Sequence, residues 1–512
     1  MGFESGWGKR IMSTKSGSAS ARGLCSSSVF DSFAVPGWIA QQNSWITDPE
    51  GSDSAAYNYP LLLRIYGPLN SEALQSSFDA LLQRHATLRS LFEVRGAVLT
   101  QIVVGEHACP FHRIDLTRVA DAEKEAAARS LIETEAELPF RLTQEIPFRV
   151  LLLQLESELH DLLIVTHHLA YDDWSNGILI RELSALYAAF AANQPSPLPD
   201  LPVQYGDFVR WSARKMTGQE LAANINFWKS QLGDGATFHH LQPDRSRSAT
   251  ASRANGPQVV RTDRTSSSGA SQAGLKRDLR RGSSEKIILP EKLARRLAHW
   301  TREQRSSIFM TLLAGFHYLL HHYSHDEDIA VGTCVANRPQ MQLEDLIGRF
   351  GNHLIIRTSM AGNPSFQEVQ QRVRESSLTA YGYQEMPFGE VLRAVQPAED
   401  VGCDSIVQAM FVLQNAPKGA WQIPGLDVRW MPVKRASTRY DLTIWLREAQ
   451  GIEVALEYNC DRFRAATIQN VLNDYRAILE HVVAHPSSPI ADHPLAAAST
   501  GMSQITAGHA AS

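Results

Sequence analysis

The sequence predicts a mixed α/β protein with two lobes, and three features support that fold class. The chain has 512 residues, 44% of them hydrophobic and 20% charged, which is globular usage at a length where chains divide into more than one core. Strand-like apolar runs and helix-like periodicity occur together in both halves. A Pro-rich stretch, Gln194 to Pro202, separates the halves. We therefore expect an N-terminal lobe over residues 29–203 and a C-terminal lobe over residues 204–490.

Each half contains helices and strands that the apolar pattern predicts. In the first half, helical spacing precedes Arg84 and recurs before the Pro-rich stretch, and an apolar run between these helices indicates a buried strand. Their residues are Leu74, Phe78, Leu81 and Leu82; Leu162 to Val165; and Leu179, Leu183, Leu186, Tyr187 and Phe190. The second half has a helix over Phe309 to Leu320, strands over Asp328 to Val331 and His353 to Arg357, and a last helix over Ile468 to Val482.

Three segments are too polar to form a core. Residues 1–28 are rich in Ser and Gly and predict a disordered tail rather than a transit peptide, and residues 491–512 predict a second tail. The segment from Asp244 to Glu285 has nine basic and four acidic residues and few apolar ones. We interpret it as a solvated flexible insertion in preference to an electropositive lure for an acidic partner.

Charge and cysteine usage exclude several classes of protein. The 49 basic and 54 acidic residues give a net charge of −5, so no basic field attracts nucleic acid. The five cysteines are odd in number and lack CxxC spacing, which argues against a disulfide framework and a zinc site. No apolar run reaches the length of a membrane span, and no signal core is present at the N-terminus. A cytoplasmic protein that does not enter the membrane is expected.

The segment from Ile164 to Ser175 carries the chemistry. It places His167 and His168 at the end of the buried strand, directly before a helix. Because side chains alternate along a strand, only one histidine can face a cleft, and the other must find a partner inside the protein. A histidine can accept a proton from an amine or hydroxyl nucleophile that attacks an acyl carbonyl, and Asp172 could fold back to support the loop. Metal binding and plain core packing remain alternatives at this point.

Other candidate motifs give weaker signals. The doublets His239-His240 and His321-His322 are interpreted as surface or structural residues. The chain has no GxSxG elbow for a serine nucleophile and no Gly-rich loop that ends in Lys-Ser/Thr. We expect a reaction that needs no nucleotide.

His167-His168-Leu-Ala-Tyr-Asp172 resembles the HHxxxD signature of the condensation domains of nonribosomal peptide synthetases, and the resemblance covers roughly residues 29–490. Further segments in the family's order make it specific. They are Ala56 to Pro60, Arg84 to Phe92, Tyr205 to Phe208 with Asn226 to Lys229, Phe309 to Ala314, Asp328 to Arg338, Ile347 to Asn352, Gln384 to Phe388 and Phe411 to Asn415.

The resemblance implies two chloramphenicol-acetyltransferase-like lobes in a V-shaped pseudo-dimer with a central tunnel. It implies an enzyme that transfers an acyl or peptidyl group from a carrier-protein thioester to an amine, forming an amide in natural-product biosynthesis. Most members of the family lie inside long chains beside other domains, whereas this sequence holds one such unit, so we expect a stand-alone monomer that acts in trans. The substrates would arrive on phosphopantetheine arms, from a donor carrier and from an acceptor carrier or a free amine or alcohol. No bound cofactor or metal is expected.

The resemblance also assigns roles to the site residues. His168 would face the tunnel and either take the nucleophile's proton or hold the amine, with His167 beside it. Asp172 would be structural, and Arg338 is the expected cationic partner. Asp173 stands where the family usually has Gly, so it adds negative charge near the developing oxyanion. Ester formation onto an alcohol, a coenzyme A-dependent acyltransferase and a non-catalytic docking module are the alternatives.

Overall fold

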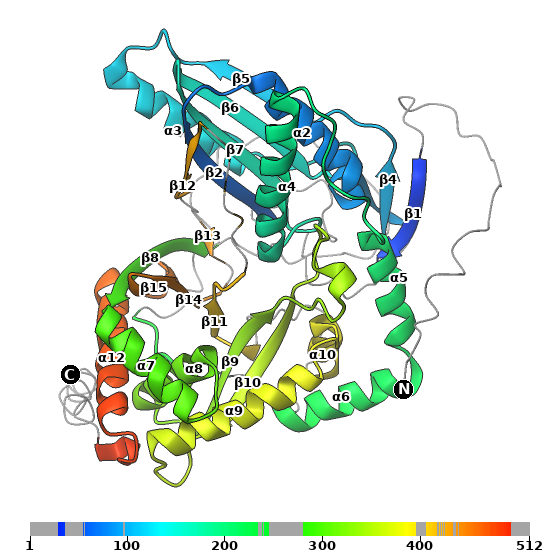
Figure 1. The fold of residues 1–512 in the computed structure, drawn as a ribbon. Helices are drawn as coiled ribbons and strands as arrows, with labels where there is room; N and C mark the ends of the chain where they lie inside the picture. Colours follow the sequence, from blue (N-terminus) through cyan, green and yellow to red (C-terminus); the bar gives the residue numbers. More distant parts are fainter. Residues whose placement is uncertain are drawn as a thin grey trace, which may run out of the picture.

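The structure is a computed structural model. It describes residues 29–35, 55, 57–95, 98–233, 238, 240–244, 280–395, 406–416, 419, 421, 423, 425–433, 437–438 and 440–492. Two sheets of different size, each with its own helices, form an upper and a lower lobe in Figure 1. The mixed α/β architecture that the sequence predicts is confirmed.

The upper lobe contains a five-stranded sheet with the order β12-β2-β7-β6-β5. Helices α2 and α4 pack together on one face, and α3 packs on β6, β2 and β7. Successive residues of a strand point to opposite faces, so Leu63 of β2 joins the core under α2 and α4 while Leu62 joins the core under α3. The elements are β2 (Asn58–Tyr66), β5 (Phe111–Asp115), β6 (Phe148–Glu156), β7 (Leu159–His167), α2 (Ser71–Arg84), α3 (Asp121–Glu137) and α4 (Asp173–Ala191).

A small three-stranded sheet lies beside the upper lobe, and two helices lead from there to the lower lobe, where the second one packs Trp228 and Leu232 into the core. The sheet has the order β1-β4-β3 and all its strand pairs are antiparallel. Helices α5 and α6 run along the right side of Figure 1 from the upper lobe to the lower one. The elements are β1 (Val29–Val35), η3 (Ala86–Arg89), β3 (Ser90–Arg95), β4 (Val98–Val104), α5 (Tyr205–Lys215) and α6 (Gly218–Leu232).

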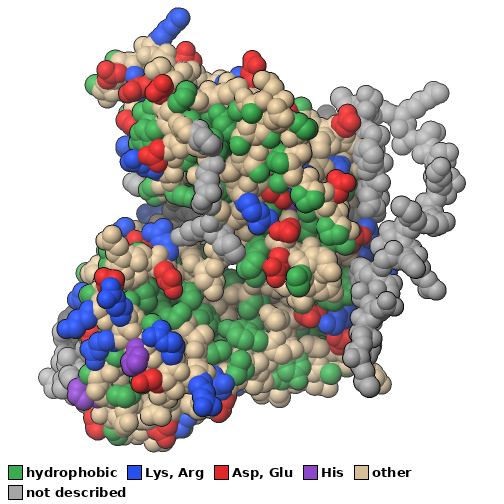
Figure 2. All heavy atoms as spheres, in the orientation of Figure 1, with side chains coloured by type: hydrophobic (Ala, Val, Ile, Leu, Met, Phe, Trp, Pro, Cys, Tyr) green, Lys and Arg blue, Asp and Glu red, His purple; other side chains and the backbone are tan. Residues whose placement is uncertain are grey.

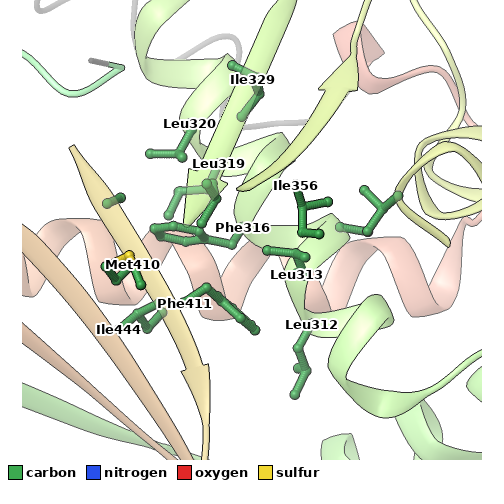
Figure 3. Packing of buried hydrophobic residues seen from close by; sticks show 14 of the residues in the cluster. Leu312, Leu313, Phe316, Leu319, Leu320, Ile329, Ile356, Met410, Phe411 and Ile444 are labelled. Atoms are coloured by element: carbon green, nitrogen blue, oxygen red, sulfur yellow. The ribbon is translucent and has the colours of Figure 1, made fainter. Parts of the chain in front are cut away.

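The lower lobe contains a seven-stranded sheet with the order β10-β9-β11-β14-β15-β8-β13. Leu313 and Phe316 of α8 pack with Ile356 of β10 and Phe411 of β11 in the largest apolar core of the described residues (Figure 3). The strands are β8 (Arg280–Leu289), β9 (Asp328–Val335), β10 (Asn352–Ser359), β11 (Ala409–Leu413), β13 (Ser437–Thr438), β14 (Leu442–Ala449) and β15 (Gly451–Asn459). The helices are α7 (Glu291–Glu303), α8 (Ile308–Ser324), η4 (Met341–Leu343), α9 (Phe366–Gly382), α10 (Phe388–Val395), α12 (Ala465–Ala484) and η5 (Ile490–Asp492).

Two segments of the C-terminal half complete the upper lobe. Strand β12 (Asp427–Met431) pairs antiparallel with β2 at the edge of the five-stranded sheet. The stretch 343–351, which we call the bridging loop, buries Leu346 and Phe350 in the core that also contains Leu163 of β7. The lobe limits at residues 203 and 204 stay a prediction, since these two segments of the C-terminal half pack in the upper lobe.

The helices and strands predicted from apolar spacing are present as α2, β7, α4, α8, β9, β10 and α12. Strand β8 begins at Arg280, within the last residues of the stretch expected as an insertion. Residues 282–285 pair antiparallel with β15 and residues 280–281 with β13, so that this polar sequence has its backbone hydrogen-bonded. Residues 245–279 and both expected tails, apart from Ala491 and Asp492 of η5, lie outside the described residues.

The surface agrees with the balanced composition. Basic and acidic side chains are mixed over both lobes on the face that Figure 2 shows. Among the helices that the structure describes, none is long and apolar enough to span a bilayer.

Candidate active site at the junction of β7 and α4

The junction between β7 and α4 fixes the His-His-x-x-x-Asp segment. The buried apolar residues of β7 pair with β2 on one side and β6 on the other, and the strand ends at His167. Asp172 is the N-cap of α4: it has extended backbone angles, and its side chain accepts a hydrogen bond from the Ser175 amide. A strand end and a helix cap therefore hold the two halves of the motif in place.

His167 and His168 point to different surroundings, as alternation along the strand predicts. His167 is fully buried, with the Phe140 ring edge-on and the Tyr57 ring tilted, each with its centroid 6.0 Å away. Its Nδ1 accepts a hydrogen bond from the Leu169 amide at 3.3 Å. These contacts make His167 part of the core.

His168 is half-buried and held in one orientation. Its Nδ1 lies 2.9 Å from the carbonyl oxygen of Tyr171. A carbonyl oxygen can only accept, so Nδ1 carries the proton of the neutral ring and Nε2 carries the lone pair. The His168 amide donates to the Tyr57 carbonyl at 2.8 Å, and the Tyr59 ring lies 6.0 Å from the imidazole. The ring is therefore prepared to accept a proton at Nε2.

Asp172 is a buried carboxylate with hydrogen-bond donors on both oxygens. The guanidinium of Arg338 donates to both of its oxygens, at 2.9 and 3.1 Å. The Ser175 hydroxyl donates to Oδ1 at 2.8 Å, and the amides of Phe350 and Gly351 donate to Oδ2 at 3.1 and 3.2 Å. Only 9% of the Asp172 side chain and 2% of the Arg338 side chain are exposed. The contact expected between the two residues is present, while their part in a reaction stays a prediction.

Arg338 also organises the bridging loop. Its Nε donates to the Leu343 carbonyl and its Nη2 to the Leu346 carbonyl, both at 3.2 Å. The guanidinium carbon lies 4.1 Å from the centre of the Phe350 ring, a distance at which a cation–π interaction stabilises the positive charge of Arg338. One side chain thus joins Asp172 of the upper lobe to three residues of the bridging loop.

A second buried carboxylate on α4, Glu182, supports the same loop. Its Oε2 lies 2.7 Å from His85 Nε2, and its Oε1 accepts from Arg84 Nε at 3.1 Å. The Ile347 amide donates to His85 Nδ1 at 3.4 Å. Burial alone would raise the pKa of Glu182, but the hydrogen bonds from His85 and Arg84 and the charge of Arg84 outweigh it and lower the pKa.

The sequence motifs include Arg84 and His85 as part of a family-like segment, but they do not identify Glu182 as the partner of these residues. The signal is present, because Glu182 lies on the apolar face of α4 beside Leu179 and Leu183. A carboxylate on an apolar helix face needs a cationic partner. The motifs also give no role to Tyr59, whose ring contacts His168.

Asp173 occupies the first turn of α4 and does not need the conformational freedom of glycine. It is not among the residues with positive φ. Its exposed carboxylate accepts hydrogen bonds at Oδ1 from the Tyr59 hydroxyl, at 2.5 Å, and from Asn176 Nδ2, at 3.0 Å. The backbone argument against activity at this position is therefore removed.

The other histidine doublets show that spacing alone does not define the site. An aspartate follows each of them at the same distance as Asp172: Asp244 after His239-His240, and Asp326 after His321-His322. His240 is buried, and its Nδ1 lies 2.8 Å from Asp326 Oδ2. Asp244 caps α12 by accepting from the Arg464 amide at 2.7 Å. These contacts are structural, and His239 lies outside the described residues.

Comparison with known proteins agrees with this geometry. The family model "Condensation domain" matches residues 35–501. The chain belongs to the condensation-domain family. A linear gramicidin synthase protein of Brevibacillus parabrevis is 34% identical to this condensation domain over 467 residues, which are 90% of the chain. Chondramide synthase of Chondromyces crocatus is 31% identical over 454 residues, 88% of the chain. The chain spans 9% and 11% of the lengths of these relatives.

Solved structures show the same fold. The X-domain from teicoplanin biosynthesis superposes with a TM-score of 0.74 at 23% identity, over 89% of this chain and 96% of that one. The first condensation domain of the calcium-dependent antibiotic synthetase superposes with a TM-score of 0.68 at 16% identity, over 90% and 97%. The two-lobed, chloramphenicol-acetyltransferase-like fold of these domains is therefore the fold of this chain, and the predicted family is confirmed.

Proposed function

We propose that this condensation domain transfers an acyl or peptidyl group from a carrier-protein thioester to an amine and forms an amide. The observation that supports this most directly is the imidazole of His168, which is half-buried with its proton directed to the Tyr171 carbonyl. That tautomer presents a basic nitrogen to a nucleophile. Asp172 does not compete as a base because its oxygens are already held by Arg338, Ser175 and the bridging loop.

The proposed amide formation needs only the thioester, the amine and the His168 imidazole. The amine nitrogen attacks the thioester carbonyl, the C–N bond forms, and the C–S bond breaks. The proton that leaves the nitrogen passes to Nε2 of His168 and then to the departing thiolate of the phosphopantetheine arm, which leaves as the thiol. Alternatively, His168 holds the amine in place while the thiolate takes the proton directly. Both versions need the same imidazole orientation.

The partners follow from the reaction. A donor carrier protein supplies the thioester, and a second carrier or a free small-molecule amine supplies the nucleophile. In this proposal the chain binds no cofactor of its own, and the phosphopantetheine arms belong to the carriers.

The decisive experiment is intact-protein mass spectrometry of an acyl-loaded carrier incubated with the domain and an amine acceptor. We expect loss of the acyl mass from the carrier together with formation of the amide, and loss of both in His168→Ala. His299→Ala is the matched control, because His299 is 70% exposed on α7 and has no part in the proposed site. Amide formation that persists in His168→Ala would overturn the proposed role.

The same assay separates the alternatives. An alcohol acceptor that gives an ester would extend the reaction to oxygen nucleophiles, since the same imidazole can serve either. Turnover with an acyl-coenzyme A and no carrier would point to the coenzyme A-dependent reaction. Complete absence of transfer from every loaded carrier would favour a docking module.

A further inference from the structure

We propose that Asp173 is a specificity-determining residue. Its carboxylate binds an alkylammonium group that the substrate carries in addition to its reacting group, either on the acceptor or on the donor acyl chain. This inference deepens the function proposed above and rests on it. Its basis is the contrast between two neighbouring carboxylates, only one of which the protein neutralises.

Asp173 lacks a cationic partner within the part of the chain that the structure describes. Its hydrogen-bond donors, Tyr59 and Asn176, are both neutral, and both bind Oδ1. Asp172, one residue earlier, is buried against Arg338. An exposed carboxylate held in one orientation by neutral donors keeps its charge available to a ligand.

The position of this carboxylate links it to the chemistry. The Tyr59 hydroxyl binds Asp173, and the Tyr59 ring lies 6.0 Å from the His168 ring and 5.5 Å from the Tyr171 ring. His168 and Asp173 therefore flank a single aromatic side chain. A substrate whose reacting group meets His168 could place a second charge at Asp173.

The brace around Asp173 fixes the direction of its carboxylate. Asn176, one helical turn along α4, donates to both Asp173 and Tyr59, and its own amide oxygen accepts from the Tyr171 hydroxyl at 3.0 Å. Four side chains thus share one hydrogen-bonded network. Because the Asp173 side chain is already held in one orientation, it loses less conformational entropy when a cation binds.

The test is an equilibrium binding measurement on the full chain, which does not depend on turnover. Isothermal titration would compare cadaverine with pentylamine as acceptor probes, and lysyl with norleucyl pantetheine thioester as donor probes. The member of one pair that carries the additional ammonium group should bind the natural chain roughly threefold to tenfold more tightly, and Asp173→Asn should remove that preference without weakening the member that lacks this group. The pair that shows the preference identifies the source of the charge.

Asp200→Asn is the control variant: it removes an exposed carboxylate from the segment before α5 and should keep the preference. Equal binding of the two members of each pair by the natural chain, or a preference that survives in Asp173→Asn, overturns the inference. Failure of amide formation alongside a charge preference that depends on Asp173 would reject the proposed function and leave this site standing.

Discussion

The two aspartates at the start of α4 are neighbours in sequence and opposites in environment. Asp172 is buried and receives hydrogen bonds from a guanidinium, a hydroxyl and three amides. Asp173 is exposed and receives them from two neutral side chains. His167 and His168 divide in the same way at the end of β7. The difference teaches that a strand end and a helix cap give adjacent residues separate surroundings, so that one of each pair is buried and the other is more exposed.

The largest expected effect separates the two histidines. His168→Ala should lower the rate of amide formation by roughly a hundredfold to ten-thousandfold, because a positioned acid-base group contributes about that much. Its unfolding midpoint in urea should change little, since the ring is half-buried. His167→Ala should instead lower the free energy of unfolding by roughly 2 kcal/mol or more by emptying space beside Phe140 and Tyr57. A His167→Ala protein as stable as the natural chain would break the comparison.

The next effect tests the buried ion pair. Asp172→Asn should destabilise the fold by about 3–5 kcal/mol, because the Arg338 charge stays buried without its counter-charge. Asp345→Asn is the matched control: Arg181 of α4 and Asp345 of the bridging loop form an exposed pair at 2.7 Å, for which less than about 1 kcal/mol is expected. Urea unfolding of both variants measures the difference, and equal losses would contradict our assignment of Asp172.

A smaller effect concerns Glu182 and pH. Its pKa is lowered in the folded chain, so the carboxylate contributes stability fully above its unfolded pKa, and the contribution is lost as pH falls through the folded pKa. Glu182→Gln should therefore cost about 1–3 kcal/mol at neutral pH, and the gap to the natural chain should narrow below about pH 4.5. Urea unfolding of both proteins at a series of decreasing pH values would measure how the difference in their free energies of unfolding narrows. A gap that stays constant down to about pH 3 would mean that the carboxylate charge is not what stabilises this contact.

The smallest effect sharpens the contrast between the aspartates. Asp173→Asn should change the free energy of unfolding by less than about 1 kcal/mol, the usual value of a charge in the first turn of a helix. Thermal unfolding of Asp173→Asn and Asp172→Asn under the same conditions would give the ratio of the two losses in stability. A loss at Asp173 as large as that at Asp172 would show that the exposed carboxylate also stabilises the fold.

Local signals made much of the fold and site predictable. The spacing of apolar residues located α8 and β9, and the resemblance identified both ends of the Asp172–Arg338 pair. The pairing of β12 with β2 was not predictable in this way, since its register depends on residues far apart in the chain. The partner of Glu182 was missed for the same reason, and the carbonyls that Arg338 binds depend on a loop conformation that no periodic pattern describes.

Strand β12 has a consequence for how the chain reaches this structure on the ribosome. Strand β2 and Asp172 are synthesised before their partners. The strand that pairs with β2, residues 427–431, and the cation that pairs with Asp172, Arg338, emerge from the ribosome later. We expect the first half to wait in a partly assembled state with an open sheet edge, the kind of surface that invites aggregation. A fragment that stops at residue 203 would remain in that state. We therefore expect the two halves of the protein to fold only when they are expressed together.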